Sequence, residues 1–357
     1  MTQNDFAVLS IREGCKKHHV SYDTILGLEN EFNKERGAEI ICISEEVCHK
    51  NIQAFSEKGF GSNIDESALG KVDGKKYVFF ATMCETDLLI HLEMLKKIHD
   101  KLIIYIFDSW ETSWENQEKV LKDISPLMVC FAYEKAKEHF KEILDCKVIA
   151  LPQSMDAEFF HPFSGSKSRI FIQIGRKSEI VHKWAKDYLE AKNIPVNDKS
   201  YLYQKSWAEY RRALIKHPIS YGIRLLKYRR SAMLTVPDTN DLAKEIAKSR
   251  FFLQAPQNID NENKTGGISE VTARFYEAMA CKSLIVGIKP RDSFDRLFPY
   301  ENAMIEVTEA DFADKIDYFI NNPEEYDRIV EKNYEYVMAN HRWKNRYDIM
   351  ILQLSTQ

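Results

Sequence analysis

The sequence predicts an α/β protein made of two doubly wound domains with parallel sheets that face a cleft. Three observations lead to this fold class. Short runs rich in Val, Ile and Phe alternate with amphipathic helical stretches, which is typical of a parallel sheet covered on both faces. The alternation pauses at residues 152–168, a stretch with Pro, Gly and Ser, and then restarts. A chain of 357 residues is also long for one domain and comfortable for two.

The expected elements follow in chain order. The first half contains predicted strands at Phe6–Ile11, Ala38–Ser44, Tyr77–Ala81, Leu102–Phe107, Leu127–Ala132 and Val148–Leu151. Its predicted helices are Asp23–Arg36, Glu85–His99, one after the fourth strand, and Glu134–Leu144. The second half contains predicted strands at Arg169–Ile174, Phe251–Ala255 and Leu284–Ile288, and helices at Val181–Ala191, Ser269–Cys281 and near the end of the chain. We therefore expect a first domain over residues 1–155 and a second over 156–335.

The composition limits the binding partners and the cellular compartment that we expect for this protein. The net charge of −4 and the lack of a recognition module argue against nucleic acid as a partner. No apolar run reaches the roughly 20 residues that cross a bilayer, and the start MTQNDFAVLS does not resemble a secretory signal. The seven cysteines are odd in number and widely spaced, which favours free thiols over a disulfide framework or a zinc site. We expect a cytoplasmic protein.

The stretch Thr265–Cys281 carries the strongest chemical signal. Gly266 and Gly267 allow a backbone turn that side chains would forbid. Ser269 is a good N-cap, so a helix is expected to begin there with free N–H groups facing the loop. Such a junction suits the phosphates or the sugar of a bound ligand.

Three charged residues of this predicted helix share one face, because Glu270, Arg274 and Glu277 stand at i, i+4 and i+7. A carboxylate on that face would accept hydrogen bonds from ribose hydroxyls. The alternative is a solvated ladder of charges that stabilises the helix by a few tenths of a kcal/mol per pair.

Several segments together resemble the GT-B glycosyltransferases of the group 1 type. Residues 274–281 read Arg-Phe-Tyr-Glu-Ala-Met-Ala-Cys, as in the donor-domain helix of that group, and the resemblance continues to Arg346. Val148–Pro162 resembles the crossover between the family's domains, and Ile170–Arg176 resembles the strand ending in Gly-Arg that opens its donor domain. The three pieces occur in the family's order.

The resemblance implies a GT-B fold with two Rossmann-like domains and a helix over residues 336–357 that crosses back to the first domain. It also implies transfer of a sugar from a nucleotide-sugar donor to a glycan or lipid-linked acceptor, in bacterial surface polysaccharide assembly, with no cofactor. Two alternatives stay open: a nucleotide-sugar epimerase on the same fold, and a non-catalytic scaffold subunit that binds a nucleotide sugar.

The resemblance also assigns donor-binding residues. Glu277 stands where the family binds the donor ribose, and Arg176, after Gly175, stands where a cation meets the diphosphate. The family's accompanying lysine corresponds to Lys183, or else to Lys177.

The sequence departs from the family at the first glutamate of its Glu-x7-Glu pair. Ser269 occupies that position, and Glu270 comes one residue late. On a helix this shift turns a side chain by about 100°. Lys282 and Ser283, which follow Cys281, also stand where the family usually has a turn that contains Gly.

The first half offers candidates of its own. Asp108 follows the predicted strand Leu102–Phe107, at the end where active-site groups gather, and would act as a general base on the acceptor hydroxyl. The alternative is a carboxylate that caps the next helix. Gly14 lies in the first loop, which often approaches the donor in this fold. His18 and His19 follow Gly14 in the chain. The alternative for these two histidines is a structural or solvent-facing position.

Two further features concern partners. Residues 205–230 carry many Lys and Arg, interleaved with aromatic residues, against the single acid Glu209. One interpretation is a surface that contacts anionic lipid headgroups at the inner face of the membrane, or an acidic glycan. The alternative is an ordinary basic surface with no partner. The sequence has no Asp-x-Asp motif and no metal-ligand spacing, so we expect metal-independent catalysis in which Arg176 and a lysine stabilise the leaving diphosphate.

Overall fold

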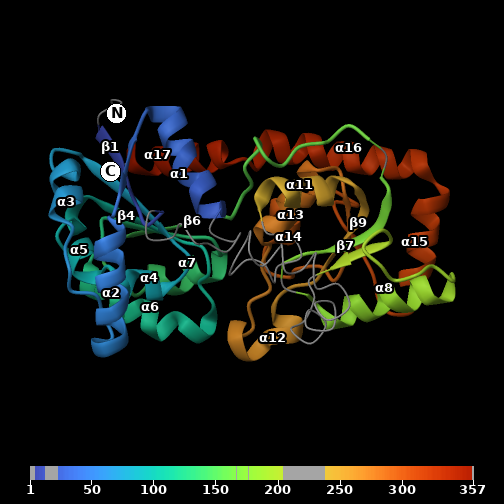
Figure 1. The fold of residues 1–357 in the computed structure, drawn as a ribbon, viewed down its shortest axis with the longest axis horizontal. Helices are drawn as coiled ribbons and strands as arrows, with labels where there is room; N and C mark the ends of the chain where they lie inside the picture. The colour runs from blue at the N-terminus through green and yellow to red at the C-terminus, as the bar shows by residue number, and fades with distance from the viewer. Residues whose placement is uncertain (1–4, 13–22, 166, 176, 204–237, 356–357) are drawn as a thin grey trace, which may run out of the picture. The chain divides into compact units, whose positions relative to one another are not determined.

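The computed structural model describes residues 5–12, 23–165, 167–175, 177–203 and 238–355. They form two compact units (Figure 1). Unit 1 comprises Met1–Gln153, Asn263–Ile268 and Trp343–Gln357, and unit 2 comprises Ser154–Glu262 and Ser269–Arg342. Each unit contains one parallel sheet with helices around it, so the predicted doubly wound α/β fold class is confirmed.

The sheet of unit 1 has the strand order β2-β1-β3-β4-β5-β6. Its strands are β1 (Phe6–Ser10), β2 (Glu39–Cys42), β3 (Tyr77–Thr82), β4 (Leu102–Ile106), β5 (Met128–Phe131) and β6 (Lys147–Ala150). Every residue of β1, β3, β4 and β5 is buried, as expected of strands covered on both faces.

The helices of unit 1 differ from expectation in three places. Its helices are α1 (Asp23–Arg36), α2 (Glu45–Lys58), α3 (Glu66–Val72), α4 (Glu85–Ile90), α5 (Leu92–Lys96), α6 (Trp114–Ile124), α7 (Glu134–Lys141) and α17 (Trp343–Ser355). The sequence did not predict α2 or α3, and the single helix expected over Glu85–His99 is two helices. The closing helix of unit 1 is α17, which packs on α1, where Lys344 Nζ lies 2.6 Å from Glu35 Oε2 (Figure 1).

The described strands of unit 2 have the order β11-β10-β9-β7-β8. They are β7 (Arg169–Gln173), β8 (Tyr201–Tyr203), β9 (Ser249–Gln254), β10 (Leu284–Gly287) and β11 (Ile305–Glu306). The helices are α8 (Glu179–Ala191), α11 (Thr239–Ala247), α12 (Asn258–Thr265), α13 (Ala273–Ala280), α14 (Phe294–Leu297), α15 (Phe312–Asn321) and α16 (Pro323–Asn340). The last residues of α12 belong to unit 1.

The start of α13 corrects the sequence analysis. The helix begins at Ala273 with Thr272 at the N-cap, so the prediction of a helix that starts at Ser269 was wrong. Ser269 is bonded to a neighbouring loop instead: its N–H donates to Asp292 Oδ2 at 2.6 Å, and its hydroxyl accepts the N–H of Arg291 at 3.1 Å. These bonds satisfy the polar groups that an N-cap would have used.

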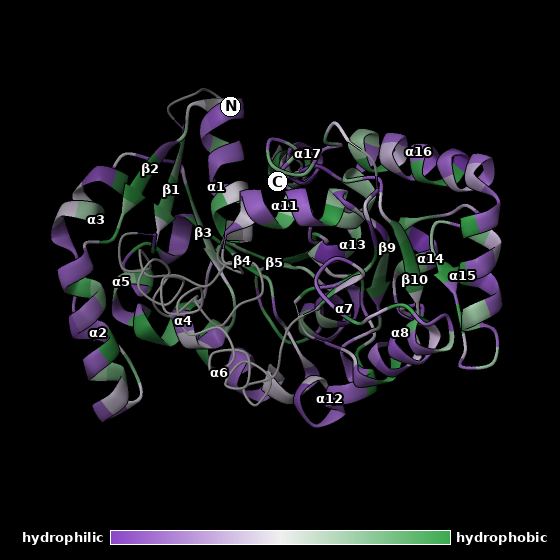
Figure 2. Ribbon diagram, turned by 45° about the vertical axis from the view of Figure 1, so that its right-hand side comes forward, coloured by the Kyte–Doolittle hydropathy of each residue, from purple (hydrophilic) through white to green (hydrophobic). Residues whose placement is uncertain are grey.

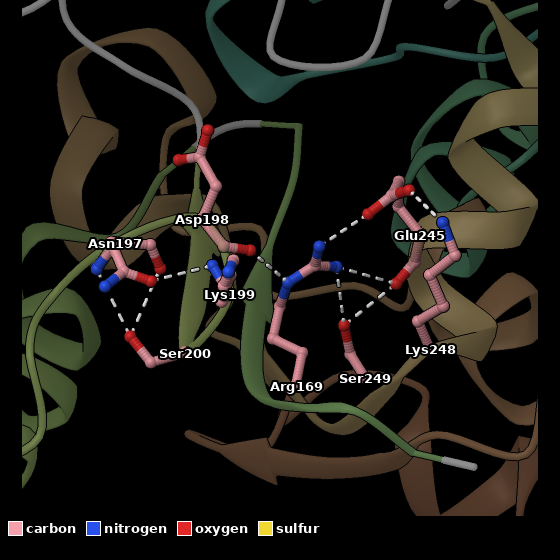
Figure 3. Close-up of polar contacts among 8 residues, drawn as sticks. All are labelled: Arg169, Asn197, Asp198, Lys199, Ser200, Glu245, Lys248 and Ser249. Atoms are coloured by element: carbon pink, nitrogen blue, oxygen red, sulfur yellow. Dashed lines mark hydrogen bonds and ion pairs between the residues drawn. The ribbon is translucent and has the colours of Figure 1, made fainter.

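The amino end of the unit 2 sheet is fastened by Arg169 (Figure 3). Its guanidinium donates to Glu245 Oε2 at 2.6 Å, to Ser249 Oγ at 3.2 Å and, through Nε, to the carbonyl of Asp198 at 2.8 Å. Lys248 binds the other oxygen of Glu245 at 2.7 Å. The cluster therefore joins β7, α11 and the loop before β8, at the end of the sheet where active-site groups do not gather.

The hydropathy pattern matches the layering within each unit. Figure 2 shows the strands mostly green, whereas α2, α15 and α16 show purple and green along the same helix. This is the pattern of helices with one face on a core. None of the helices in the described part of the chain is both long and apolar enough to cross a membrane.

Candidate active site

A pocket of unit 2 lies where the direction of strand addition reverses. From β7 the chain adds β8 on one side of the sheet, whereas β9, β10 and β11 follow on the other. In open α/β sheets ligands bind beyond the carboxyl ends of the strands at such a switch point. The pocket is lined there by Ile174 after β7 and by Gln254 and Ala255 at the end of β9.

Two helix N-termini meet this pocket. Ser178 is the N-cap of α8 and Thr272 is the N-cap of α13, and both residues line it. Neither helix has a side-chain hydrogen bond at its cap. The first N–H groups of a helix lack partners within the helix and carry the positive end of its dipole. The two helix starts are therefore suited to bind an anion.

The hydroxyl of Ser178 adds a further donor. Ser178 is 5% exposed, and its Oγ has no hydrogen-bond partner. Buried hydroxyls are normally satisfied, so an unpaired one in a pocket wall is a candidate ligand contact. Nothing in the sequence analysis singled out Ser178; its role depends on the burial that only the fold creates.

Two cations also line the pocket. The side chain of Lys177 is 11% exposed, lies 3.0 Å from Glu179 Oε1, and has its ammonium 5.5 Å from the ring centre of Tyr203. Arg274 comes from α13, and its side chain is 17% exposed. Asp260 lines the pocket as well. The combination of two cations, two helix N-termini and a free hydroxyl is suited to a phosphate or diphosphate group.

Glu277 lies beside the pocket and contacts one of its cations. It is 3% exposed, and its Oε2 forms an ion pair with Nη1 of Arg274. Glu270 is 4% exposed and precedes the helix, so it does not share a helical face with the other two. The alternative of a solvated charge ladder is wrong, because both carboxylates are buried.

The structure separates the remaining donor-side candidates. Lys183 lies on the outer face of α8, 63% exposed, with its Nζ 2.8 Å from Glu309 Oε1, and it does not line the pocket. Gly266 and Gly267 belong to unit 1, where the N–H of Gly267 donates to Glu111 Oε2 at 2.9 Å. A Cβ on Gly266 would lie 2.5 Å from that oxygen, so the turn needs its glycine.

Gly175 lies beside one of the pocket's cations. Its φ of +95° favours glycine, and an added Cβ would stand 3.4 Å from Nε of Arg274. The arginine therefore runs directly past the end of β7. Arg176, Gly14, His18, His19 and the basic segment 205–230 lie outside the described residues.

Asp108 follows β4 in unit 1 and is half-buried. Its Oδ1 accepts the hydroxyl of Tyr133 at 3.3 Å, and its carbonyl accepts Nε2 of Gln117 at 3.3 Å. The helix that follows, α6, has no side-chain cap, so the capping alternative finds no support. Asp108 remains a candidate base.

The sequence analysis missed the polar groups at the switch point of unit 1, which lies between β1 and β3. Ser10 ends β1, and its hydroxyl donates to Glu29 Oε2 at 2.8 Å; Arg12 Nη2 lies 2.6 Å from the same oxygen. At the end of β3, Asp87 accepts the hydroxyl of Thr82 at 2.9 Å. Burial raises the pKa of Asp87, although the bonds from Thr82 and the Met83 N–H oppose the shift.

Neither unit offers an evident metal centre: within the described residues, no three His, Cys, Asp or Glu side chains are grouped so as to hold a metal ion. The six described cysteines, Cys42, Cys48, Cys84, Cys130, Cys146 and Cys281, are free thiols. Burial raises the pKa of the Cys146 thiol to about 11, which makes it a poor nucleophile.

The chain resembles known proteins in part of its sequence and in its fold. Residues 221–351 match a family model described as glycosyl transferase-like. Sucrose-phosphate synthase from Thermosynechococcus elongatus is similar in structure, with a TM-score of 0.60 and 12% identity over 99% of this chain and 98% of that one. Anabaena HepE, solved in complex with UDP-glucose, has a TM-score of 0.60 and 11% identity over 99% of both chains. No curated protein matches the sequence. The structural similarity establishes the GT-B fold.

Proposed function

We propose that this chain, a glycosyltransferase with the GT-B fold, transfers a sugar from a nucleoside-diphosphate donor to a glycan or lipid-linked glycan acceptor. The observation that carries the proposal is the cationic pocket at the switch point of unit 2, with Lys177, Arg274, the Ser178 hydroxyl and the starts of α8 and α13 in its wall. A donor diphosphate has the negative charge that such a wall binds.

The same groups would serve catalysis. When the glycosidic bond to the diphosphate breaks, negative charge develops on the leaving oxygen, and fixed cations and helix N-termini stabilise it. Arg176, next to Gly175 in the chain, would add a further cation, as the family resemblance implies. No metal is needed for this role.

The proton of the acceptor hydroxyl must also be removed. If the enzyme inverts the configuration of the sugar, Asp108 is our candidate base. If it retains the configuration, the donor's own phosphate would accept the proton. Asp108→Asn separates the two: a loss of transfer with intact donor binding supports the base, and unchanged transfer excludes it.

A structurally similar protein suggests which donor to test first. HepE is named with UDP-glucose bound, so UDP-glucose is the first donor to test. The acceptor belongs, by family resemblance, to bacterial surface polysaccharide. We place the protein in the cytoplasm, with segment 205–230 touching the inner face of the membrane; sedimentation with anionic and with neutral vesicles tests that contact.

The testing experiment is a calorimetric and thermal-shift panel of uridine, guanosine, cytidine and adenosine diphosphates and their sugars. One nucleotide should raise the melting temperature, since a ligand at 100 times its Kd adds roughly 2.7 kcal/mol to stability. The bound sugar nucleotide is then incubated with and without glycan acceptors. Transfer supports the proposal, turnover without acceptor indicates an epimerase, and binding without any turnover indicates a scaffold. If no nucleotide binds, the donor-site assignment fails.

A further inference from the structure

The pair Arg274 and Glu277 joins the pocket to a buried carboxylate. The two residues are three positions apart on α13, so they lie on the same side of the helix. The guanidinium lines the pocket, whereas Glu277 does not, and only 4% of its side chain is exposed. The carboxylate thus reaches the pocket through its ion pair with Arg274.

The guanidinium is held from a second side. Its Nε and stem run past Gly175, which has no side chain and the positive φ that glycine tolerates. Glu277 engages Nη1. A guanidinium presents five N–H donors in a rigid plane. The contacts at Nε and at Nη1 together fix this plane and therefore the direction of the remaining N–H donors. Arg274 is therefore oriented by contacts that do not involve a ligand.

A guanidinium held in one orientation is suited to donate hydrogen bonds to two oxygens of the same group. Arginine binds phosphate with two parallel hydrogen bonds, which a lysine cannot do. In the same wall stand Lys177, the unpaired hydroxyl of Ser178 and the starts of α8 and α13. All of these contacts favour the diphosphate part of a donor over its ribose.

We propose that Arg274 binds the donor diphosphate and that Glu277 is a positioning residue that acts through Arg274 rather than a ribose ligand. The inference rests on the proposed function and reassigns the carboxylate that the family resemblance places on the ribose. The buried ion pair holds the arginine in its binding orientation.

The experiment compares three probes by calorimetry: the nucleoside diphosphate found in the panel, its 2′,3′-dideoxy analogue, and inorganic pyrophosphate. They are titrated into the wild type, Glu277→Gln, Arg274→Met and the double variant, with Lys183→Ala as the control. We expect Glu277→Gln to weaken all three probes by the same factor, on the order of tenfold. In the Arg274→Met background, Glu277→Gln should have no further effect, because its action passes through the arginine.

The opposite pattern would overturn the inference. If Glu277→Gln weakens the nucleotide but spares pyrophosphate and the dideoxy analogue, Glu277 binds the ribose. A merely structural role would lower the melting temperature of Glu277→Gln without a common loss across the probes. Should Glu277→Gln not fold, Glu277→Asp keeps the charge and withdraws the carboxylate by one methylene: equal weakening of all three probes supports the inference, and weakening of the nucleotide alone refutes it.

Failure of the proposed function looks different. In that case the wild type binds none of the nucleotides, and both proposals fall. If only the positioning role of Glu277 is wrong, nucleotide binding by the wild type stays intact.

Discussion

The two lysines after Gly175 lead to one sharp prediction, since the sequence could not choose between them. Lys177→Ala removes an ammonium from the wall of the proposed donor pocket, where its side chain is 11% exposed. Lys183→Ala removes an ammonium that is 63% exposed and paired with Glu309 away from the pocket. The substitutions are chemically identical, so Lys183→Ala is the matched control for Lys177→Ala.

The magnitudes follow from these surroundings. A hydrogen bond from an ionised group contributes about 1.5–3 kcal/mol when it is largely shielded from water. At about 1.4 kcal/mol per tenfold change, Lys177→Ala should weaken nucleoside diphosphate binding by about 10- to 100-fold. Lys183 takes part in an exposed ion pair, whose contribution is about 0–1 kcal/mol and concerns stability rather than binding. Its removal should change the Kd by less than about twofold.

The assay is isothermal titration of the two variants and the wild type with the nucleoside diphosphate from the panel. Lys177→Ala also loses its contacts with Glu179 and Tyr203, worth about 1 kcal/mol of stability, so circular dichroism must first show that the variant is folded. If Lys183→Ala loses as much affinity as Lys177→Ala, or if Lys177→Ala binds like the wild type, the assignment of the pocket to the diphosphate is wrong.

Three further predictions concern stability, each measured by urea unfolding. Arg169→Met should cost about 1–3 kcal/mol, because it removes the hydrogen bonds to Asp198, Glu245 and Ser249 (Figure 3), while Lys248 still pairs with Glu245. Nucleotide affinity should stay unchanged, and a weakened affinity would contradict the placement of the cluster away from the proposed site. Gly287→Ala should lower the free energy of unfolding by more than about 3 kcal/mol, because the added Cβ would lie 1.7 Å from the Gln254 carbonyl oxygen. Gly70→Ala is the control: it has open space around the added Cβ and should not destabilise the protein. Equal effects of the two substitutions would refute the steric argument. Burial lowers the pKa of His91 to about 4, so the unfolded chain binds a proton below pH 6.5 that the folded chain refuses. Stability should therefore fall by about 3 kcal/mol more between pH 6.5 and 4 in the wild type than in His91→Phe, and parallel curves would show that His91 is not buried as described.

The sequence by itself determined the fold class and indicated the region of the proposed donor site. Alternating apolar strands and amphipathic helices are local patterns, and each strand of a covered parallel sheet shows its burial in its own composition. The motif around Arg274 and Glu277 and the Gly175 turn are likewise short and contiguous. For this reason both could be recognised before any contact between distant residues was known.

The tertiary structure decided which of these residues meet. Ser269 looked like an N-cap, but bonds to Arg291 and Asp292, more than twenty residues away, satisfy its polar groups and move the helix start to Ala273. No local pattern contains that information.

Burial and long-range contact decided the rest of the candidate site. Lys177 and Lys183 lie six residues apart in the sequence, and the turn into α8 places one in the pocket wall and the other in solvent. Ser178 became a candidate only because the fold buries its hydroxyl without a partner. The charge ladder became a buried ion pair for the same reason: the exposure of a side chain depends on what packs over it, and that is a property of the folded chain rather than of its neighbours in sequence.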